Sequence, residues 1–268
     1  MNELQRKERE LLEVFLDICG RLGLRYFLVC GSALGAVKYR GFIPWDDDVD
    51  VALLREDYEQ FVQRAPELLP EHIFLQNYRT EPAFPAIFSK LRNSETTYVE
   101  KSASRLPINH GIYIDIFPLD GYPAKRSEQK RLERRKRIYR RMLSAAFLPN
   151  RAWKWLLYAP LRLLGVHRHT AAIARRYESL IARYPTAGSA ILANHGNWQG
   201  RREYAPAAQY GQGVWGEFEG LKVRLPAQTD AYLRQKYGDY TADPPPAEQI
   251  GHHYFTRCDC GRSYRDSV

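Results

Sequence analysis

The first half of the chain alternates between helical and strand-like patterns of apolar residues. Apolar positions recur at helical spacing over residues 3–20 and 55–69, and each stretch predicts an amphipathic helix. Gly31 and Ser32 are expected to turn the chain into a short helix over residues 33–39. Runs rich in aromatic and β-branched residues predict strands, which cover residues 24–30, 49–54, 72–76, 86–92, 97–99 and 112–116.

The middle of the chain has a different pattern. Residues 127–147 and 169–184 predict helices, and they flank the run WKWLLYAPLRLLGV at 153–166. Pro160 interrupts this run, which is shorter than the ~20 apolar residues of a membrane span. The proline-rich stretch 242–249 predicts an extended segment rather than a helix.

Composition narrows the class of protein. A chain of 268 residues with 44% hydrophobic and 26% charged residues is typical of a globular protein that buries a sizeable core. The charged N-terminus lacks the apolar centre of a signal peptide, and four cysteines fit a reducing compartment better than a disulfide framework. We therefore expect a cytoplasmic protein.

The net charge of +9 is concentrated in one segment. Residues 125–141 hold ten Lys or Arg and two Glu, which leaves a charge of only +1 for the rest of the chain. Two interpretations stay open: residues 125–166 bind an anionic membrane surface, or they form a solvated helix followed by an ordinary buried one. No nucleic-acid-binding signature accompanies the basic run, so nucleic acid is not an expected partner.

An acidic motif lies inside an apolar segment. Asp48 and Asp50 are separated by one residue, so on a strand they point to the same side, where two carboxylates repel each other unless a cation lies between them. Mg²⁺ prefers such oxygen ligands together with water and phosphate. The upstream Gly31 and Ser32 could accept a phosphate at a helix start. The alternative is an ordinary solvated turn.

Three segments in order resemble the LicD family of phosphotransferases. They are GSALGAVKYRGFIPWDDDVDVALLREDYEQF from Gly31, YIDIFPLDGY at 113–122 and LPAQTDAYLRQKYGDYTADPPP at 225–246. Members of this family move phosphocholine from CDP-choline onto bacterial surface glycans, and its relatives fukutin and fukutin-related protein transfer ribitol phosphate from CDP-ribitol. The resemblance implies an α+β fold, with a nucleotidyltransferase-like mixed β-sheet flanked by helices and a helical basic insertion.

The resemblance also implies a set of site residues. Asp48 and Asp50, joined by Asp115 from the strand predicted at 112–116, are expected to bind one or two Mg²⁺ (or Mn²⁺) ions and to be catalytic. Asp46 and Asp48 satisfy the same spacing, and the resemblance selects the later pair. Asp115 could instead cap a turn, and Asp120 is expected to serve the turn before Gly121.

Further residues are candidates for contacts with the substrates. We expect Gly31 and Ser32 to cradle the donor phosphates, Lys90 and Arg92 to neutralise phosphate charge, and Trp45 to stack on a base or a choline-like cation. Each of these three side chains could instead be an ordinary surface or core residue. Zinc binding and substrate contact are both conceivable roles for the C-terminal group His252, His253, Cys258 and Cys260.

These expectations combine into one functional hypothesis. Residues 1–122 would form the catalytic core, 123–212 a helical insertion for the acceptor or a membrane surface, and 213–268 the C-terminal part of the catalytic domain. The enzyme would transfer a phospho-alcohol group from a CDP-alcohol, CDP-choline first among them, to a glycan or lipid-linked glycan, release CMP, and work in the cytoplasm or at the inner membrane face. The alternatives are a nucleotidyltransferase or D-x-D glycosyltransferase, and a non-enzymatic basic membrane- or nucleic-acid-binding protein.

Overall fold

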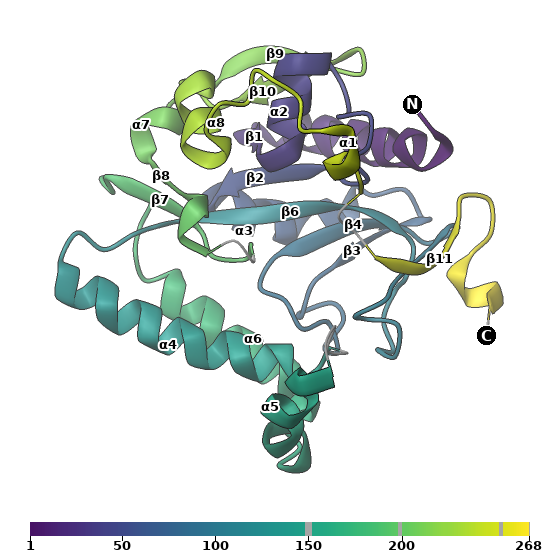
Figure 1. The fold of residues 1–268 in the computed structure, drawn as a ribbon, viewed down its shortest axis with the longest axis vertical. Coiled ribbons are helices and arrows are strands. Elements are labelled where there is room, and N and C mark those ends of the chain that lie inside the picture. The colour runs from purple at the N-terminus through teal and green to yellow at the C-terminus, as the bar shows by residue number, and fades with distance from the viewer. Residues whose placement is uncertain (148–151, 198–199, 252–253, 268) are drawn as a thin grey trace.

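A mixed β-sheet forms the centre of the computed structural model, which describes residues 1–147, 152–197, 200–251 and 254–267 (Figure 1). Within these residues, seven strands belong to this sheet. The order β1-β2-β6-β4-β3 is extended by β7, which pairs with β6, and by β8, which pairs with β7. The strands are β1 (Tyr26–Leu28), β2 (Asp50–Leu54), β3 (Ile73–Gln76), β4 (Ser89–Asn93), β6 (Ile112–Gly121), β7 (Ile191–Asn194) and β8 (Tyr204–Pro206). The α+β fold class expected from the sequence is confirmed.

The long strand β6 organises the sheet. It runs parallel to β2 on one side, and on the other side it pairs antiparallel with β4 and then with β7. All ten of its residues, IYIDIFPLDG, are buried, because it is covered on both faces. Such a strand reads as an apolar run rather than a clean alternation, and the charges within it therefore need partners.

Three helices of the N-terminal part pack around the sheet. Helix α1 (Glu3–Leu22) begins with a capping box between Asn2 and Gln5 and ends at Gly23, whose φ of 68° suits glycine. It buries Leu11, Leu12 and Phe15 in the main core. The other two are α2 (Cys30–Tyr39) and α3 (Arg55–Arg64), the latter continued by the 3₁₀ turn η1 (Ala65–Glu67).

Helix α2 begins earlier than expected. The prediction of a turn at Gly31 and Ser32 was wrong in detail, because both residues already lie in the first turn of α2. Strand β1 is correspondingly shorter than the predicted 24–30. The small residues of CGSALGA allow the helix to start directly after the strand, with no loop between them.

The helical layer consists of α4 (Arg126–Ser144), α5 (Ala152–Leu163) and α6 (Thr170–Ile181), with the 3₁₀ turn η2 (Val166–His169) between the last two. A second core of apolar residues from α4, α6 and the sheet includes Leu132, Leu143, Ile173 and Tyr177. Strands β7 and β8 also come from residues 123–212, so this region adds to the central sheet as well. The division into three domains stays a prediction.

The remaining elements follow β7 in the chain, apart from β8, which belongs to the central sheet. They are the 3₁₀ turn η3 (Gly200–Glu203), α7 (Ala207–Tyr210), the hairpin of β9 (Val214–Phe218) and β10 (Leu221–Leu225), α8 (Thr229–Tyr237), the 3₁₀ turn η4 (Pro246–Glu248), β11 (Phe255–Asp259) and the 3₁₀ turn η5 (Tyr264–Ser267). Strand β11 pairs with β5 (Thr97–Glu100) in a separate two-stranded sheet. Helix α8 lies beside α2 in Figure 1. No helix in the described residues is both long and apolar enough to cross a membrane.

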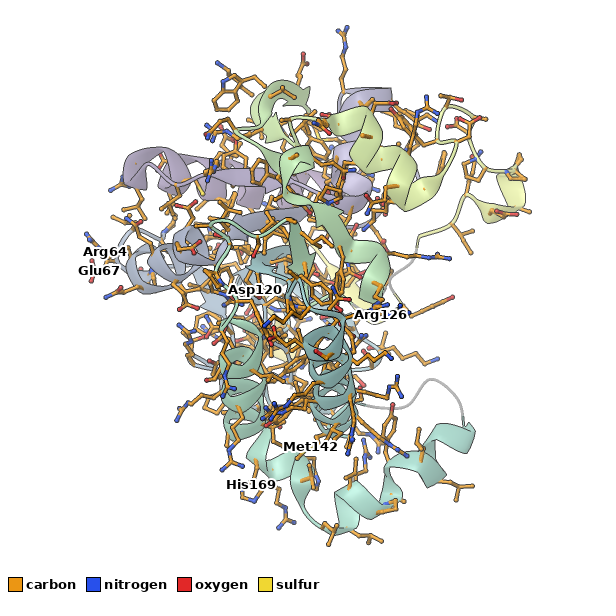
Figure 2. The ribbon with its side chains drawn as sticks, turned by 90° about the vertical axis from the view of Figure 1, so that its left-hand side faces the viewer. Arg64, Glu67, Asp120, Arg126, Met142 and His169 are labelled. Carbon is orange, nitrogen blue, oxygen red and sulfur yellow. The ribbon has the colours of Figure 1, made fainter. Side chains whose placement is uncertain are left out.

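A buried ion-pair network ties the helical layer to the sheet. The expectation that Asp120 serves a turn was wrong: it lies in β6, is fully buried, and accepts two hydrogen bonds from Arg55, at 2.7 Å from Nε and 2.8 Å from Nη2. Arg55 Nη1 also donates to Glu178 of α6 at 3.0 Å. Asp120 is labelled in Figure 2, where the sheet meets α4 and α6.

Candidate active site

Asp50 and Asp115 lie side by side on parallel strands. They are direct partners in the register of β2 and β6, where neighbouring strands are about 4.8 Å apart, so their side chains share one face of the sheet. Both residues are more than 90% buried. The opposite face carries Ile114 and Ile116 and is covered by α3, because Tyr58 of that helix bonds Ser89, the partner of Ile116 in β4. Asp115 therefore lies beside Asp50 as expected, and the metal-binding and catalytic roles of the two residues stay predictions.

Lys90 completes this row of charges. It is the partner of Asp115 on the other neighbouring strand, β4. Its Nζ atom lies 3.1 Å from Asp115 Oδ1 and 3.4 Å from Glu100 Oε2, and the side chain is only 5% exposed. We call the three residues Asp50, Asp115 and Lys90 the site row. The Lys90 ammonium group, held between Asp115 and Glu100 on one face of the sheet, can meet the negative charge of a phosphate.

Ser32 connects the start of α2 to the site row. Its buried hydroxyl accepts a hydrogen bond of 2.8 Å from the backbone N–H of Asp50. Val29, the residue before α2, donates its N–H to the Asp50 carbonyl at 3.1 Å. The N-terminus of α2, whose first N–H groups favour anions, is thereby fixed next to Asp50.

The acidic run at residues 46–48, before β2, lies against the start of α2. A Cβ at Gly31 would lie 2.6 Å from Asp46 Oδ2, so glycine permits the close approach of the two segments. Gln5 of α1 donates to the Asp46 carbonyl at 3.0 Å. Asp48 lies two residues before β2 and is half-buried. Asp46 thus contacts α2, while Asp50 belongs to the site row.

Arg92 and Trp45 occupy different surroundings. Arg92 is completely buried, and its guanidinium donates to Gln76 Oε1 and the Gly111 carbonyl, each at 2.6 Å, and to Glu100 Oε2 at 3.0 Å. These bonds fix the strands around the site row. Trp45 is half-buried, with its ring 6.3 Å from that of Tyr39. Their roles as substrate contacts stay predictions.

Asp50 and Asp115 are the residues of the site row that could hold a metal ion. In the part of the chain that the structure describes, no three His, Cys, Asp or Glu side chains form a ready-made metal site. Mg²⁺ commonly takes one or two protein carboxylates and completes its shell with water and substrate phosphates. The adjacent carboxylates of Asp50 and Asp115 fit this mode, whereas a closed structural metal site would need more protein ligands.

Glu8 is a site neighbour that the sequence reasoning missed. It is 2% exposed in α1, and burial, followed by the charges of Asp48, Asp47, Asp46 and Asp115, raises its pKa well above the usual value. Burial and the neighbouring carboxylates both favour the protonated form of Glu8 next to the acidic run. Its position offered a signal, because it lies four residues after Leu4 and three before Leu11, on the apolar side of the predicted helix.

A second missed group lies at the base of α2. Lys236 of α8 forms a fully buried ion pair with Glu203, and its Nζ atom lies 3.1 Å from the sulfur of Cys30. Burial raises the pKa of the Cys30 thiol well above its usual value. Cys30 has a φ of 54°, unusual for a residue other than glycine, and its N–H bonds Tyr232 of α8 at 3.1 Å. Helix α8 thus contacts the first residue of α2 through Tyr232 and Lys236.

The C-terminal cysteines lie on or next to β11. Cys258 and Cys260 are half-buried free thiols, and burial together with the neighbouring Cys260 raises the pKa of Cys258 to about 12. His252 and His253 lie outside the described residues, so the expectation of a role for the whole group stays untested.

Comparisons with known proteins agree with this geometry. Residues 23–142 match the family model described as LicD/FKTN/FKRP, nucleotidyltransferase domain. The lipopolysaccharide cholinephosphotransferase LicD of Haemophilus influenzae is 27% identical over 267 residues, covering 94% of this chain and 97% of the relative. The ribitol 5-phosphate transferase FKRP of Homo sapiens is 29% identical over 94 residues, covering 35% of this chain and 19% of FKRP.

The matched segments coincide with the site. The family model spans the start of α2, the acidic run, β2, β4 and β6, which carry Ser32 and the whole site row. The match to the Haemophilus protein continues through the helical layer and the C-terminal segment. Residues 23–142 are therefore similar to the LicD/FKTN/FKRP nucleotidyltransferase domain, and the chain as a whole is similar to the Haemophilus cholinephosphotransferase LicD along most of its length.

Proposed function

We propose that this enzyme transfers phosphocholine from CDP-choline to a hydroxyl group of a cell-surface glycan or its lipid-linked precursor, and that it releases CMP. Support for the choline headgroup comes from the Haemophilus relative, which is named a cholinephosphotransferase and matches along 94% of this chain. The match to FKRP, named a ribitol 5-phosphate transferase, supports phospho-alcohol transfer more broadly.

The observation that carries the proposal is the in-register placement of Asp50, Asp115 and Lys90 beside the start of α2. Two carboxylates and one ammonium group meet there beside the N-terminus of α2. The N–H groups of a helix N-terminus favour a bound phosphate. In this proposal the diphosphate of the donor lies between the first turn of α2 and the site row. Lys90 then reduces the negative charge on the phosphate oxygens.

The carboxylates have two tasks in this scheme. Asp50 and Asp115, with Asp48 close by, would bind Mg²⁺ or Mn²⁺, which supplies positive charge at the transferred phosphate and at the departing CMP. Asp115 would also accept the proton of the acceptor hydroxyl as that oxygen attacks the phosphorus. Transfer between two bound substrates is sufficient, so no covalent enzyme intermediate is required.

The test is CMP release from a panel of CDP-choline, CDP-ribitol and CDP-glycerol in the presence of glycan acceptors. Asp50→Asn and Asp115→Asn should each lower the rate by about 100-fold or more, since charge stabilisation by a metal contributes several kcal/mol. Asp17→Asn is the matched control, because Asp17 is an exposed carboxylate of α1, with 65% of its side chain accessible. Unchanged activity in both site variants would contradict the proposal.

Metal binding has a separate readout. Calorimetric titration with Mg²⁺ and CDP-choline should show coupled binding to the native enzyme and a strong loss of it in Asp50→Asn, but not in Asp17→Asn. The released product separates the enzymatic alternatives, because a nucleotidyltransferase would release pyrophosphate and a glycosyltransferase a nucleoside diphosphate. A protein without enzymatic function would show neither product nor metal-dependent nucleotide binding.

A further inference from the structure

Helix α5 carries an apolar stripe on its outer side. Leu156, Pro160 and Leu163 are exposed and recur four and three residues apart, so they share one face of the helix, and Leu164 follows directly. The exposed fractions are 80% for Leu156, 88% for Leu163 and 77% for Leu164. Single exposed leucines are common on proteins, whereas a continuous stripe of this exposure marks an interaction surface.

The orientation of α5 is fixed by its other side. Arg162 donates from Nε to the Ala145 carbonyl at 2.8 Å and from Nη2 to the Phe147 carbonyl at 2.6 Å. These bonds attach the last turn of α5 to the residues that follow α4. Figure 1 shows α5 at one end of the long axis, beyond α4 and α6 and away from the sheet. The leucines therefore face outward at an extremity of the molecule.

Exposed cations lie on the two elements that adjoin α5 in the chain. Arg134, Arg137 and Arg141 are exposed along the second half of α4, and Arg168 is exposed in η2, directly after α5. Figure 2 labels Met142, in the last turn of α4, and His169, in η2, close to this end of the molecule. We call these four arginines together with Leu156, Leu163 and Leu164 the basic–apolar end.

We propose that the basic–apolar end binds the surface of an anionic lipid bilayer. An interfacial helix buries its apolar face at the boundary of head groups and acyl chains, and Lys or Arg residues beside it meet the anionic head groups. Leu163 and Leu164 would enter the bilayer surface, and the arginines of α4 would lie over its phosphates. The proposal goes beyond phosphotransfer, because it concerns where the enzyme works rather than what it transfers.

Two other occupants fit the same surface less well. A second copy of this chain would bring two strongly basic helices together, and three leucines are too few for the interface of about 1,200 Å² or more that stable complexes bury. A nucleic acid would be held by the arginines through its phosphates, but it would leave the leucines without a role. The lipid surface uses both features at once.

Flotation of the purified full-length enzyme with vesicles tests the proposal. Vesicles of phosphatidylcholine with phosphatidylglycerol should bind the enzyme, and vesicles of phosphatidylcholine alone should bind it far more weakly. The double variant Leu163→Glu/Leu164→Glu should lower partitioning by about tenfold or more, since two exposed leucines lose their apolar burial. The triple variant Arg134→Gln/Arg137→Gln/Arg141→Gln should lower it similarly and remove most of the salt dependence.

A control places a glutamate at an exposed apolar residue elsewhere on the protein. Val214 is 43% exposed in β9, at the opposite end of the long axis in Figure 1, so Val214→Glu should leave vesicle binding unchanged. Thermal unfolding of each variant verifies that the fold persists. Wild-type binding by the leucine variant, or equal binding to both vesicle types, would overturn the proposal.

Two further outcomes would also refute it. One is a wild-type enzyme that forms a dimer and does not bind the vesicles, together with a leucine variant that is monomeric. This result would identify a protein interface. The other is binding of a DNA or RNA oligonucleotide in place of the vesicles, with no effect of the leucine variant. The vesicles contain neither donor nor glycan, so none of these outcomes bears on the proposed phosphotransfer.

Discussion

Cationic side chains are placed differently in the sheet that carries the site row and in the helical layer. In the sheet region, Arg55, Lys90 and Arg92 are more than 90% buried, and each contacts at least one carboxylate. In α4, most of the basic residues are exposed, and Lys136 is a buried exception that pairs with Glu133.

The physical cost of burial explains this difference. A buried cation loses its hydration and stays charged only when carboxylates and hydrogen-bond acceptors replace the water. An exposed arginine keeps its hydration and contributes little to the fold. The sheet region therefore uses its cations to fix geometry, while the helical layer leaves them available for anions outside the protein.

The largest expected effect concerns the buried network that joins the two regions. Arg55→Met leaves Asp120 and Glu178 as buried carboxylates without their shared cation, so the free energy of unfolding should fall by about 3–5 kcal/mol. Chemical denaturation measures this change. The control is Arg234→Met, which removes an exposed pair with Asp230 on α8 and should cost no more than about 0.5 kcal/mol.

Equal losses in those two variants would contradict the distinction between buried and exposed pairs. A second variant, Arg55→Met/Asp120→Leu, sharpens the test. It removes both charges of the bidentate pair, so it should be more stable than Arg55→Met alone.

A smaller effect is expected from the hydroxyl that links α2 to the site row. Ser32→Ala leaves the buried N–H of Asp50 without its side-chain acceptor, and the free energy of unfolding should fall by about 1–3 kcal/mol. The rate of CMP release should fall as well, because Asp50 loses its fixed position. Ser179→Ala removes an exposed hydroxyl that bonds the Arg175 carbonyl in α6, and it should change neither quantity measurably.

The pH dependence of stability tests the surroundings of Glu8. Its folded-state pKa lies above the ordinary value of 4.5, so the protonated form stabilises the fold fully below about pH 4.5, and this contribution is lost as the pH rises through the folded-state pKa. The neutral, isosteric variant Glu8→Gln should therefore melt at a higher temperature than the wild type at about pH 8, with the difference vanishing toward about pH 4.

Calorimetric melting curves at several pH values give this comparison. Glu13→Gln provides the control, because Glu13 is an exposed residue of the same helix, with 59% of its side chain accessible, and should show no such pH dependence. A melting temperature of Glu8→Gln that falls below the wild-type value only as the pH rises would show that the charged form of Glu8 stabilises the fold.

The smallest effect on stability is expected in the helical layer. Arg134→Gln/Arg137→Gln should alter the free energy of unfolding by no more than about 0.5 kcal/mol, because both side chains are exposed. The same variant should nevertheless weaken vesicle binding clearly. A large loss of stability would mean that these arginines fix the fold in the way that Arg55 does.

Local patterns were sufficient for most of the elements. The apolar spacing in residues 3–20 predicted α1, and the aromatic and β-branched run at 112–116 predicted the first half of β6. Boundaries were less accurate: β6 continues to Gly121, because β2 and β7 pair with its second half and Arg55 neutralises Asp120 where the sequence indicates a turn. Likewise, α2 begins at Cys30 and not at the predicted residue 33. The small residues after Cys30 fit a turn as well as a first helical turn, so the sequence did not show where the helix starts.

The site was predictable only in part. Two acids one residue apart in an apolar segment drew attention to Asp48 and Asp50, and family resemblance added Asp115. The burial of Arg92 and of Glu8 and the Lys236–Glu203 pair were not foreseen, because each depends on segments that are remote in sequence.

The sequence by itself determined the periodic elements, the acidic motif and the concentration of positive charge in residues 125–141, because each of these is a property of neighbouring residues. Only the tertiary structure decided that Asp50, Asp115 and Lys90 form one row, since strand register brings together residues that lie 65 and 25 positions apart. It also decided that Asp120 is a buried partner of Arg55 and that the leucines of α5 face outward. Pairing and burial arise from contacts between distant segments, and no local pattern specifies them.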